Sequence, residues 1–307
     1  MARSQSDSVR FVFVTGKGGV GKTSVAAARA IAYAKEGKRV LIAMCNAKER
    51  LSDLFASAPI GADIVVVAPN ISAVNMDPAR AMEEYGMLAL RSKMLYGILF
   101  DNKFVRAFFK AVPGIQEWTL LGKAWFHTTE ILPDGSPRFD VVILDAPATG
   151  HGLDMLRVPK VIVDIVPPGL LRRDAERAYN MFKNPKESHV LLVTLPEELP
   201  VTETLELASA LEKELQLPIG EIVVNGVLAP IFDEATGQLL EGTLGQGGVN
   251  PGDREIDAAA RRALRERLQA RSIARLESEM HRSPRLLPFL LQGVNSPNDV
   301  ALLAERF

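Results

Sequence analysis

Short apolar runs recur along the chain and alternate with segments of helical periodicity. The apolar runs lie at 10–15, 38–44, 71–76, 139–145, 189–195 and 221–228, with a shorter one at 285–290. Amphipathic or alanine-rich segments, such as 24–37, 172–182 and 202–215, separate most of them. Strands that read as unbroken apolar runs are typical of parallel sheets covered by helices on both faces. The pattern therefore predicts an α/β fold with a doubly wound, mostly parallel sheet.

Two intervals interrupt this alternation. From about 77 to 133 the sequence is amphipathic without a convincing strand, which predicts a helical insertion on the α/β core. Residues 232–253 are rich in glycine and lack periodicity, so we expect a long loop there. The next segment, 253–282, carries eight arginines and six acidic residues. It predicts a solvated helix whose inward positions are Leu264, Leu268, Ile273, Leu276 and Met280.

Composition narrows the class of protein without naming a function. The chain has 307 residues, of which 47% are hydrophobic and 24% charged, and its formal net charge is −1. This balance is ordinary for a soluble globular protein and does not favour nucleic-acid binding. No stretch approaches the roughly 18 apolar residues that a membrane helix requires, so we expect a cytoplasmic protein without an integral membrane segment. The single cysteine, Cys45, excludes an intrachain disulfide framework and a CxxC metal site, and we interpret it as a small buried apolar residue.

A glycine-rich loop, TGKGGVGKT, occupies 15–23 between a predicted strand and a predicted helix. Its Gly16-x-x-x-x-Gly21-Lys22-Thr23 spacing fits the P-loop, in which backbone N–H groups surround the phosphates of a nucleotide. In such a loop the lysine neutralises the β- and γ-phosphates and the Thr23 hydroxyl coordinates Mg²⁺. The sequence therefore predicts ATP and Mg²⁺ as ligands. The residues predicted to bind the nucleotide here are Gly16, Lys17, Gly18, Gly19, Val20, Gly21, Lys22, Thr23 and Ser24.

The second lysine of the loop, Lys17, identifies a subclass. GKGGVGKT resembles the deviant P-loop of the ATPases that include the nitrogenase iron protein, MinD and ParA. The resemblance implies that Lys17 crosses a dimer interface and contacts the nucleotide of the partner. The position agrees with this, because a long cation at the outer bend of the loop can reach a neighbour's phosphates. ATP held between two chains would then stabilise a closed dimer.

The segment FDVVILDAPATGHGLDMLRVP, at 139–159, distinguishes between branches of that subclass. Asp145 ends an apolar run, as a Walker B acid that holds Mg²⁺ does. The following APATGH resembles the switch of the ArsA-like ATPases, the arsenite-pump and tail-anchored-protein targeting relatives, whereas MinD and ParA relatives read closer to DTPPG. Other segments agree, among them ERLSDLF, VPGIQE, VTLPEELPVTET and VVNGVL, so the resemblance covers nearly the whole chain. We therefore interpret 1–307 as a single P-loop ATPase domain with one helical insertion.

The resemblance also implies roles for residues outside the loop. Asn225 and the Pro288–Phe289 region would contact adenine, although a strand-end asparagine can also serve only in a turn. Thr23, Asp53 and Asp145 would form the metal site. His151, which closes the switch, is equally interpretable as a structural hydrogen-bonding residue.

The first switch departs from the family. Its usual form is close to STDPAHSLSD, but here the aligned stretch, 44–53, carries Asn46 where the acid that orients and deprotonates the attacking water is expected. An amide cannot accept a proton, and losing a general base costs about 10²–10⁴ in rate. Because phosphoryl transfer also depends on positioning, Asn46 predicts slow hydrolysis, with Glu49 as a substitute base. The catalytic residues of this interpretation are Lys17, Asn46 and Asp145. A hydrolysis-dead subunit that pairs with an active paralogue is the alternative.

The predicted insertion is unusually apolar. Met82, Tyr85, Met87, Leu88, Leu90, Met94, Leu95, Ile98 and Leu99 are followed by Phe104, Val105, Phe108, Phe109 and Val112. These residues suit either ordinary packing or an adaptable surface for an apolar protein client, as the resemblance to the targeting ATPases implies. Trp118 and Trp125, seven residues apart, are predicted to share one inward helix face. The overall expectation is a homodimer, or a heterodimer with a related ATPase, and a ParA- or MinD-type positioning ATPase is a third possibility.

Overall fold

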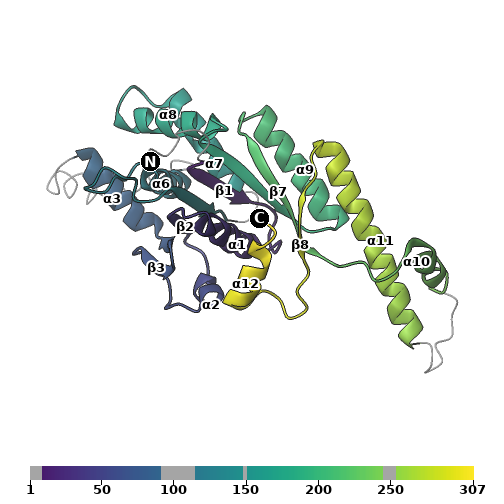
Figure 1. Ribbon diagram of the computed structural model, residues 1–307. Helices are drawn as coiled ribbons and strands as arrows, with labels where there is room; N and C mark the ends of the chain where they lie inside the picture. The colour runs from purple at the N-terminus through teal and green to yellow at the C-terminus, as the bar shows by residue number, and fades with distance from the viewer. Residues whose placement is uncertain (1–8, 91–114, 148–150, 245–253) are drawn as a thin grey trace.

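In the computed structural model, residues 9–90, 115–147, 151–244 and 254–307 are described (Figure 1). Within them one eight-stranded sheet has the order β3-β4-β2-β5-β1-β6-β7-β8. The strands are β1 (Phe11–Thr15), β2 (Val40–Cys45), β3 (Val65–Ala68), β4 (Ile71–Met76), β5 (Val141–Asp145), β6 (Ser188–Thr194), β7 (Ile219–Val227) and β8 (Arg285–Pro288). All neighbouring strands pair in parallel except β3 and β4, which are antiparallel. The predicted doubly wound, mostly parallel sheet is confirmed.

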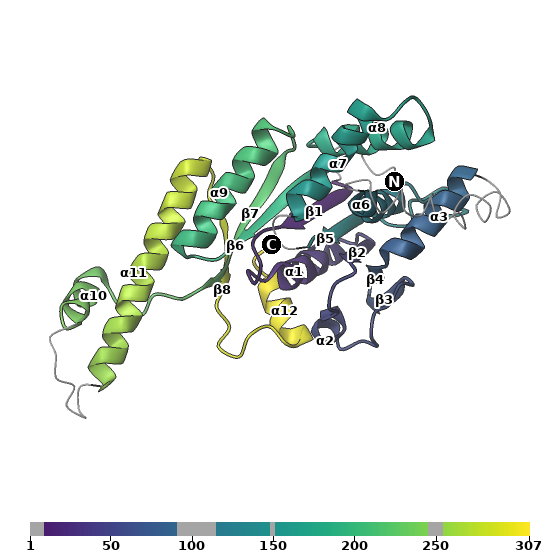
Figure 2. The ribbon, with the colours of Figure 1, turned by 180° about the vertical axis from the view of Figure 1, so that it is seen from behind.

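Helices cover both faces of the sheet (Figures 1 and 2). They are α1 (Lys22–Lys35), α2 (Leu51–Phe55), α3 (Pro78–Leu90), α6 (Ile115–His127), α7 (His151–Ile165), α8 (Leu170–Lys183), α9 (Glu198–Lys213), α10 (Glu234–Glu241), α11 (Arg254–Met280) and α12 (Pro297–Ala304). The β1 residues Phe11 and Phe13 face the core shared with α6–α9, while Val12 and Val14 face the core shared with α1 and α12. This alternation explains why β1 reads as a continuous apolar run, since both of its faces are buried.

Helix α1 begins directly after the phosphate loop and packs on one face of the sheet. Its alanine-rich side is buried, with Ala26, Ala27 and Ala28 inaccessible to solvent. The small side chains let the helix lie close to the strands beneath it. The helix stops where the sequence predicted, because Gly37 adopts φ +81°, a left-handed conformation that glycine reaches without strain.

Two elements differ from the prediction. Strand β3 is missing from the predicted set because it is a short edge strand, with Val66 76% exposed. It leads into β4 and pairs with it in an antiparallel hairpin. Part of the predicted loop at 232–253 is helix α10, which begins at Glu234. The carboxylate of Asp233, the residue before it, caps the helix by accepting from the backbone N–H of Thr236 at 2.8 Å. None of the α10 residues is buried, so no apolar stripe marked it as a helix.

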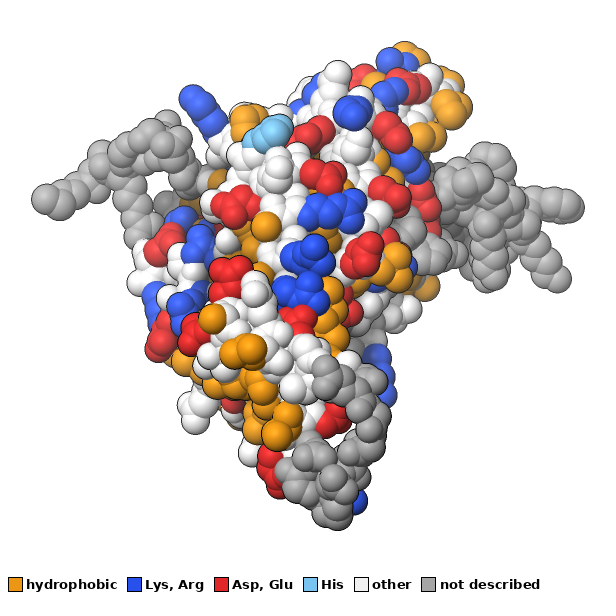
Figure 3. Space-filling view, turned by 90° about the vertical axis from the view of Figure 1, so that its right-hand side faces the viewer, with side chains coloured by type: hydrophobic (Ala, Val, Ile, Leu, Met, Phe, Trp, Pro, Cys, Tyr) orange, Lys and Arg blue, Asp and Glu red, His pale blue; other side chains and the backbone are white. Residues whose placement is uncertain are grey.

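Helix α11 is the predicted solvated helix, and Figure 3 shows side chains of both charges over this side of the molecule. Spacings of four residues pair Arg261 with Asp257 and Arg275 with Glu279. Leu276 is buried and Ile273 and Met280 pack against the core, as expected. Leu268 is wrong as an inward position, because it is 49% exposed and the buried position is that of its neighbour Gln269. The N-terminal half of α11 and the α10 helix lie beyond the edge of the sheet (Figures 1 and 2).

The predicted insertion contains helices α3 and α6 on either side of residues that lie outside the described part of the chain. Trp118 of α6 is buried and Trp125 packs partly buried against the same core, which confirms their shared inward face. Met82 also packs against that core. The apolar cluster from Tyr85 to Val112 falls where side chains are not described. None of the described helices is long and apolar enough to cross a membrane.

Candidate nucleotide site

The predicted site residues lie where parallel strands end at one edge of the sheet. Strand β1 is followed by the loop at 16–21, and β2 is followed by Asn46. Asp145 is the last residue of β5, and Asn225 lies near the end of β7. Because β1, β2 and β5 are neighbours in register, their carboxyl ends converge. In open α/β sheets this crevice is where ligands bind.

The phosphate loop is held so tightly that two of its glycines have no room for a side chain. A Cβ atom on Gly16 would lie 2.1 Å from the carbonyl oxygen of Val193, and one on Gly21 would lie 2.3 Å from the amide nitrogen of Asn225. Both residues also have positive φ, +151° and +90°. Val20 is buried, whereas the bend at Lys17, Gly18 and Gly19 is exposed. This fits a loop whose backbone N–H groups face a ligand.

Lys22 turns back over the loop. Its ammonium donates to the carbonyl oxygens of Gly16 and Lys17 at 3.1 and 3.0 Å. Burial lowers the pKa of Lys22, and the nearby negative charge of Asp145 opposes that shift. The cation is therefore partly desolvated at the centre of the loop, where a phosphate group would interact with it more strongly than in water.

Thr23 and Asp145 form a hydroxyl–carboxylate pair, with the Thr23 hydroxyl donating to Asp145 Oδ2 at 2.6 Å. Asp145 is 5% exposed, and its other oxygen, Oδ1, is buried without a hydrogen-bond partner in the described structure. Burial raises the pKa of Asp145 to about 6, against the opposing effects of Thr23 and Lys22. A buried acceptor without a donor is costly and calls for a ligand. Hydroxyl and carboxylate oxygens are the donors that Mg²⁺ prefers, so this pair fits the predicted metal.

The first switch segment is less closely assembled. Asn46 is exposed and adopts φ +47°, a left-handed conformation that asparagine tolerates better than most residues, and its N–H donates to Met76 O at 3.0 Å. Both oxygens of Glu49 accept from Ser52, one from its N–H and one from its hydroxyl, so Glu49 is bound to the first turn of α2. Asp53 is exposed and makes no hydrogen bond or ion pair with Thr23 or Asp145 in the structure. The predicted metal set is thus brought together only in part.

The structure gives Lys17 a partner that sequence reasoning missed. Its ammonium forms an ion pair with Glu203 of α9, 186 residues away along the chain. The Lys17 side chain is 45% exposed and that of Glu203 is 23% exposed, while the second Glu203 oxygen is buried without a hydrogen-bond partner among the described residues. No local pattern connects the two residues, because only the packing of α9 beside the loop makes them neighbours.

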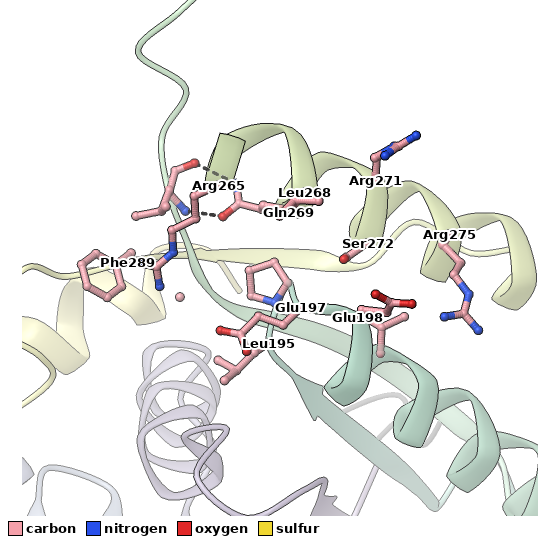
Figure 4. A pocket seen from close by; sticks show the side chains of 14 residues that line it. Leu195, Glu197, Glu198, Arg265, Leu268, Gln269, Arg271, Ser272, Arg275 and Phe289 are labelled. Atoms are coloured by element: carbon pink, nitrogen blue, oxygen red, sulfur yellow. Dashed lines mark hydrogen bonds between the residues drawn. The ribbon is translucent and has the colours of Figure 1, made fainter. Parts of the chain in front are cut away.

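Of the residues predicted to contact adenine, Asn225 contacts the phosphate loop directly, whereas Phe289 lies at the edge of a cavity. The Asn225 amide donates to Val20 O at 2.9 Å, so it braces the phosphate loop from the side of β7. Phe289 is 45% exposed, and its N–H donates to Val227 O at 2.8 Å just after β8, which ends at Pro288. Phe289 borders a cavity of about 590 Å³ between the ends of β7 and β8 and the helices α9 and α11 (Figure 4).

The second switch is described only at its ends. Thr149 and Gly150 lie outside the described residues, and His151 is the first residue of α7. A Cβ atom on Gly152 would lie 2.9 Å from the hydroxyl of Thr15, so the start of α7 is packed against the end of β1. Cys45, at the end of β2, is partly buried against the core, and burial raises the pKa of its thiol.

Comparison with known proteins agrees with this geometry. The sequence model of the anion-transporting ATPase family (ArsA ATPase) matches residues 9–167, just over half of the chain. The chain belongs to this family. The matched region includes the phosphate loop, Asn46, Asp53 and Asp145, and it ends just after α7.

Several curated relatives extend the similarity beyond that region. ATPase BagA of Mycobacterium tuberculosis (strain ATCC 25618 / H37Rv) is 29% identical over 233 residues, which cover 72% of this chain and 66% of that protein. The arsenical pump-driving ATPase of Escherichia coli is 31% identical over 240 residues, which cover 71% of this chain and 39% of the pump-driving ATPase. An ATPase ASNA1 homolog of Entamoeba dispar is 27% identical over 269 residues, 74% of this chain and 79% of that protein. This ArsA-family chain thus spans just under two thirds of the mycobacterial relative.

Proposed function

We propose that this ArsA-family chain binds Mg²⁺-ATP and hydrolyses it slowly as one half of a nucleotide-closed dimer. The observation that carries the proposal is the arrangement of three side chains at the phosphate loop. The Lys22 ammonium lies over the loop, and Thr23 and Asp145 are hydrogen-bonded beside it. The loop itself packs closely against Val193 and Asn225. Similarity to several ATPases supports the nucleotide. Thr23 and Asp145 would hold Mg²⁺, which would help to neutralise the charge of the phosphates.

The chain's own groups then divide the work of hydrolysis. The backbone of the loop and Lys22 would bind the phosphates, and Asn46, which is exposed at the end of β2, would orient a water toward the γ-phosphorus. The water oxygen bonds to phosphorus as the bond to the ADP oxygen breaks, and the proton leaves with solvent or phosphate because an amide cannot accept it. Lys17 of each subunit would stabilise the charge on the other subunit's phosphates.

A dimer that closes around ATP would bring two copies of the helical insertion together. At the described end of this region, Phe126 and Ile131 are 41% and 59% exposed, which supports a surface for an apolar protein client. A non-catalytic subunit that pairs with an active paralogue remains the second candidate, and Asn46 is the observation that favours it.

Three measurements test the proposal on the purified protein. Light scattering with Mg²⁺-ATP should show a dimer that Lys17→Ala abolishes while ATP binding to the monomer survives. Phosphate release should be slow in wild type and faster in Asn46→Asp, because the aspartate restores a proton acceptor. A dimer that persists in Lys17→Ala contradicts the role of Lys17. Unchanged turnover in Asn46→Asp contradicts the role of Asn46, and turnover that appears only with a related subunit identifies the non-catalytic partner instead.

A further inference from the structure

The turn that follows β2 is bound to the end of β4. Strands β2 and β4 pair in parallel up to Cys45 and Met76, and the N–H of Asn46 extends this ladder by donating to Met76 O at 3.0 Å. The chain then leaves the sheet, because Asn46 adopts φ +47°. Asn75 binds the next residue: its Oδ1 accepts from Ala47 N–H at 3.1 Å, and its Nδ2 donates to Ala47 O at 2.9 Å. A single side chain therefore satisfies both backbone polar groups of Ala47.

Two hydrogen bonds to one residue fix its orientation, whereas one bond fixes little more than a distance. The Asn75 amide is planar and carries its acceptor and its donor side by side, so Ala47 can satisfy both only in one orientation. This constraint matters because a left-handed backbone is unfavourable for a residue with a side chain and persists only where surrounding contacts hold it. Strand β4 lies between β2 and β3, so the contact with Asn75 is anchored within the sheet.

The direction of the Asn46 side chain depends on these backbone contacts. The side chain is exposed and forms no hydrogen bond with any residue that the structure describes, so contacts of its own do not orient it. Its direction follows from the backbone at Asn46, which is bound to Met76 on one side and, through Ala47, to Asn75 on the other. Phosphoryl transfer depends on the position of the attacking water, so a group that orients this water must itself be held in place.

We infer that Asn75 is a positioning residue for hydrolysis, which fixes the turn at Asn46 and Ala47 and so directs the Asn46 amide toward the attacking water. The inference rests on the proposed slow hydrolysis of Mg²⁺-ATP and adds to it a residue outside the phosphate loop and outside both switches. Asn75 acts through Asn46 and not on the nucleotide. Its loss should therefore lower the rate constant of hydrolysis and leave the affinity for Mg²⁺-ATP unchanged.

The test is a double-mutant cycle that measures binding and hydrolysis separately. Isothermal titration calorimetry gives the Kd for Mg²⁺-ATP, and single-turnover phosphate formation gives the rate constant, for wild type, Asn75→Ala, Asn46→Ala and the double variant. Asn75→Ala should hydrolyse ATP about tenfold more slowly, as expected for the loss of one or two hydrogen bonds, and should keep the wild-type Kd. In the Asn46→Ala background the same substitution should have no further effect, because no amide is left to direct.

Two further variants complete the design. Ser72→Ala is the matched control, since it changes another partly buried polar residue of β4, and it should leave both the Kd and the rate constant unchanged. Asn75→Asp keeps the shape of the side chain but places a carboxylate oxygen against Ala47 O, so it should slow hydrolysis as Asn75→Ala does. A wild-type Kd in either Asn75 variant shows that its nucleotide site is folded.

Three results would overturn the inference and leave the proposed ATPase function intact. The first is a wild-type rate constant in both Asn75 variants. The second is an equal loss of rate in the wild-type and Asn46→Ala backgrounds, since Asn75 would then act independently of Asn46. The third is a weaker Kd for Mg²⁺-ATP that accounts for the slower reaction. Failure of both wild type and Asn46→Asp to hydrolyse ATP would instead overturn the proposed function itself.

Discussion

Asp145 is held at a thermodynamic cost that can be measured. Its carboxylate is 5% exposed, one of its oxygens has no hydrogen-bond partner among the described residues, and burial raises its pKa from an ordinary 3.8 to about 6. Each tenfold change in proton affinity is worth about 1.36 kcal/mol, so the ionised group costs the native state roughly 3 kcal/mol. Asp145→Asn removes the charge and keeps the shape. We therefore expect the variant to be more stable than wild type at pH 7.5, by at most about 3 kcal/mol.

The pH dependence distinguishes this cause from general repacking. Because the pKa of Asp145 is higher in the folded state than in the unfolded chain, wild type gains stability as the carboxyl group is protonated. That contribution is fully present below pH 3.8 and is lost as the pH rises through about 6. The advantage of Asp145→Asn should therefore be largest above pH 7 and nearly absent near pH 4. Asp53→Asn is the matched control, since it removes an exposed carboxylate on α2 and should show no such step.

The assay is urea unfolding at several pH values without metal or nucleotide, followed by a repeat with Mg²⁺-ATP. Ligand at a hundred times its Kd stabilises the native state by about 2.7 kcal/mol. We expect this gain in wild type only, because Asp145→Asn loses the carboxylate proposed to hold Mg²⁺. The order of stability should then approach equality or reverse. An Asp145→Asn protein that is no more stable than wild type at pH 7.5, or whose advantage is the same at pH 4, would refute the reasoning.

Two further predictions concern ion pairs at opposite ends of the sheet. Glu203→Gln removes the ion pair that holds Lys17 within its own subunit, so it should lower the protein concentration needed for Mg²⁺-ATP-dependent dimerisation in sedimentation velocity. The decrease should be up to about fivefold, because this partly exposed pair is worth no more than about 1 kcal/mol. Glu206→Gln, which changes an exposed acid on the same helix, should have no effect, and weaker dimerisation of Glu203→Gln would contradict the idea. Glu221→Gln should cost about 3 kcal/mol in urea unfolding at pH 7, since it leaves the largely buried Arg29 guanidinium unpaired. Burial alone would raise the pKa of Glu221, but His189 and Arg29 lower it below its ordinary 4.5. The loss of stability in Glu221→Gln should therefore fade as the pH falls below that value, where the wild-type carboxylate is also protonated. A loss that does not depend on pH would indicate a packing defect instead.

Most of the sheet could be predicted because a parallel strand buried on both faces reads as an uninterrupted apolar run. The strands β1, β2 and β4 to β8 all fall on such runs. β3 does not, since an exposed edge strand has no need of a continuous apolar sequence. Helix α10 was missed for a related reason: it buries no residue, and its one sequence signal is the short cap from Asp233 to Thr236.

The site divides in the same way between local and distant contacts. The spacing of Gly16, Gly21, Lys22 and Thr23 predicts the loop because those residues act within one turn of chain. Asp145 could be assigned to the same metal site as Thr23 because it ends the strand next to β1, and the structure brings the two side chains into contact at 2.6 Å. Glu203 could not be found, since it reaches Lys17 from a helix whose packing no local pattern specifies.

Helix α11 shows why an inward face is hard to assign from apolar periodicity alone. The chain leaving β7 has free backbone groups that need partners more than apolar cover. Gln269 supplies them, accepting from Leu228 N–H at 2.8 Å and donating to Leu228 O at 3.0 Å. One turn before it, Glu266 accepts from Ile231 N–H. Leu268 is the more apolar residue, but Gln269 is the buried one because its side chain forms hydrogen bonds with the backbone of Leu228.

The contacts of α11 also connect it to both sides of the phosphate loop. On one side, Asn225 braces Val20, and three residues later Leu228 is fastened to α11 by Gln269. On the other side, Lys17 pairs with Glu203 of α9, and the preceding residue, Thr202, accepts a hydrogen bond from Arg275 of α11 at 2.8 Å. Both contacts of the loop therefore lead to one helix within a few residues. Since α11 also lines the cavity beside Phe289, a ligand that filled the loop and this cavity together would bind two sites whose relative position α11 fixes.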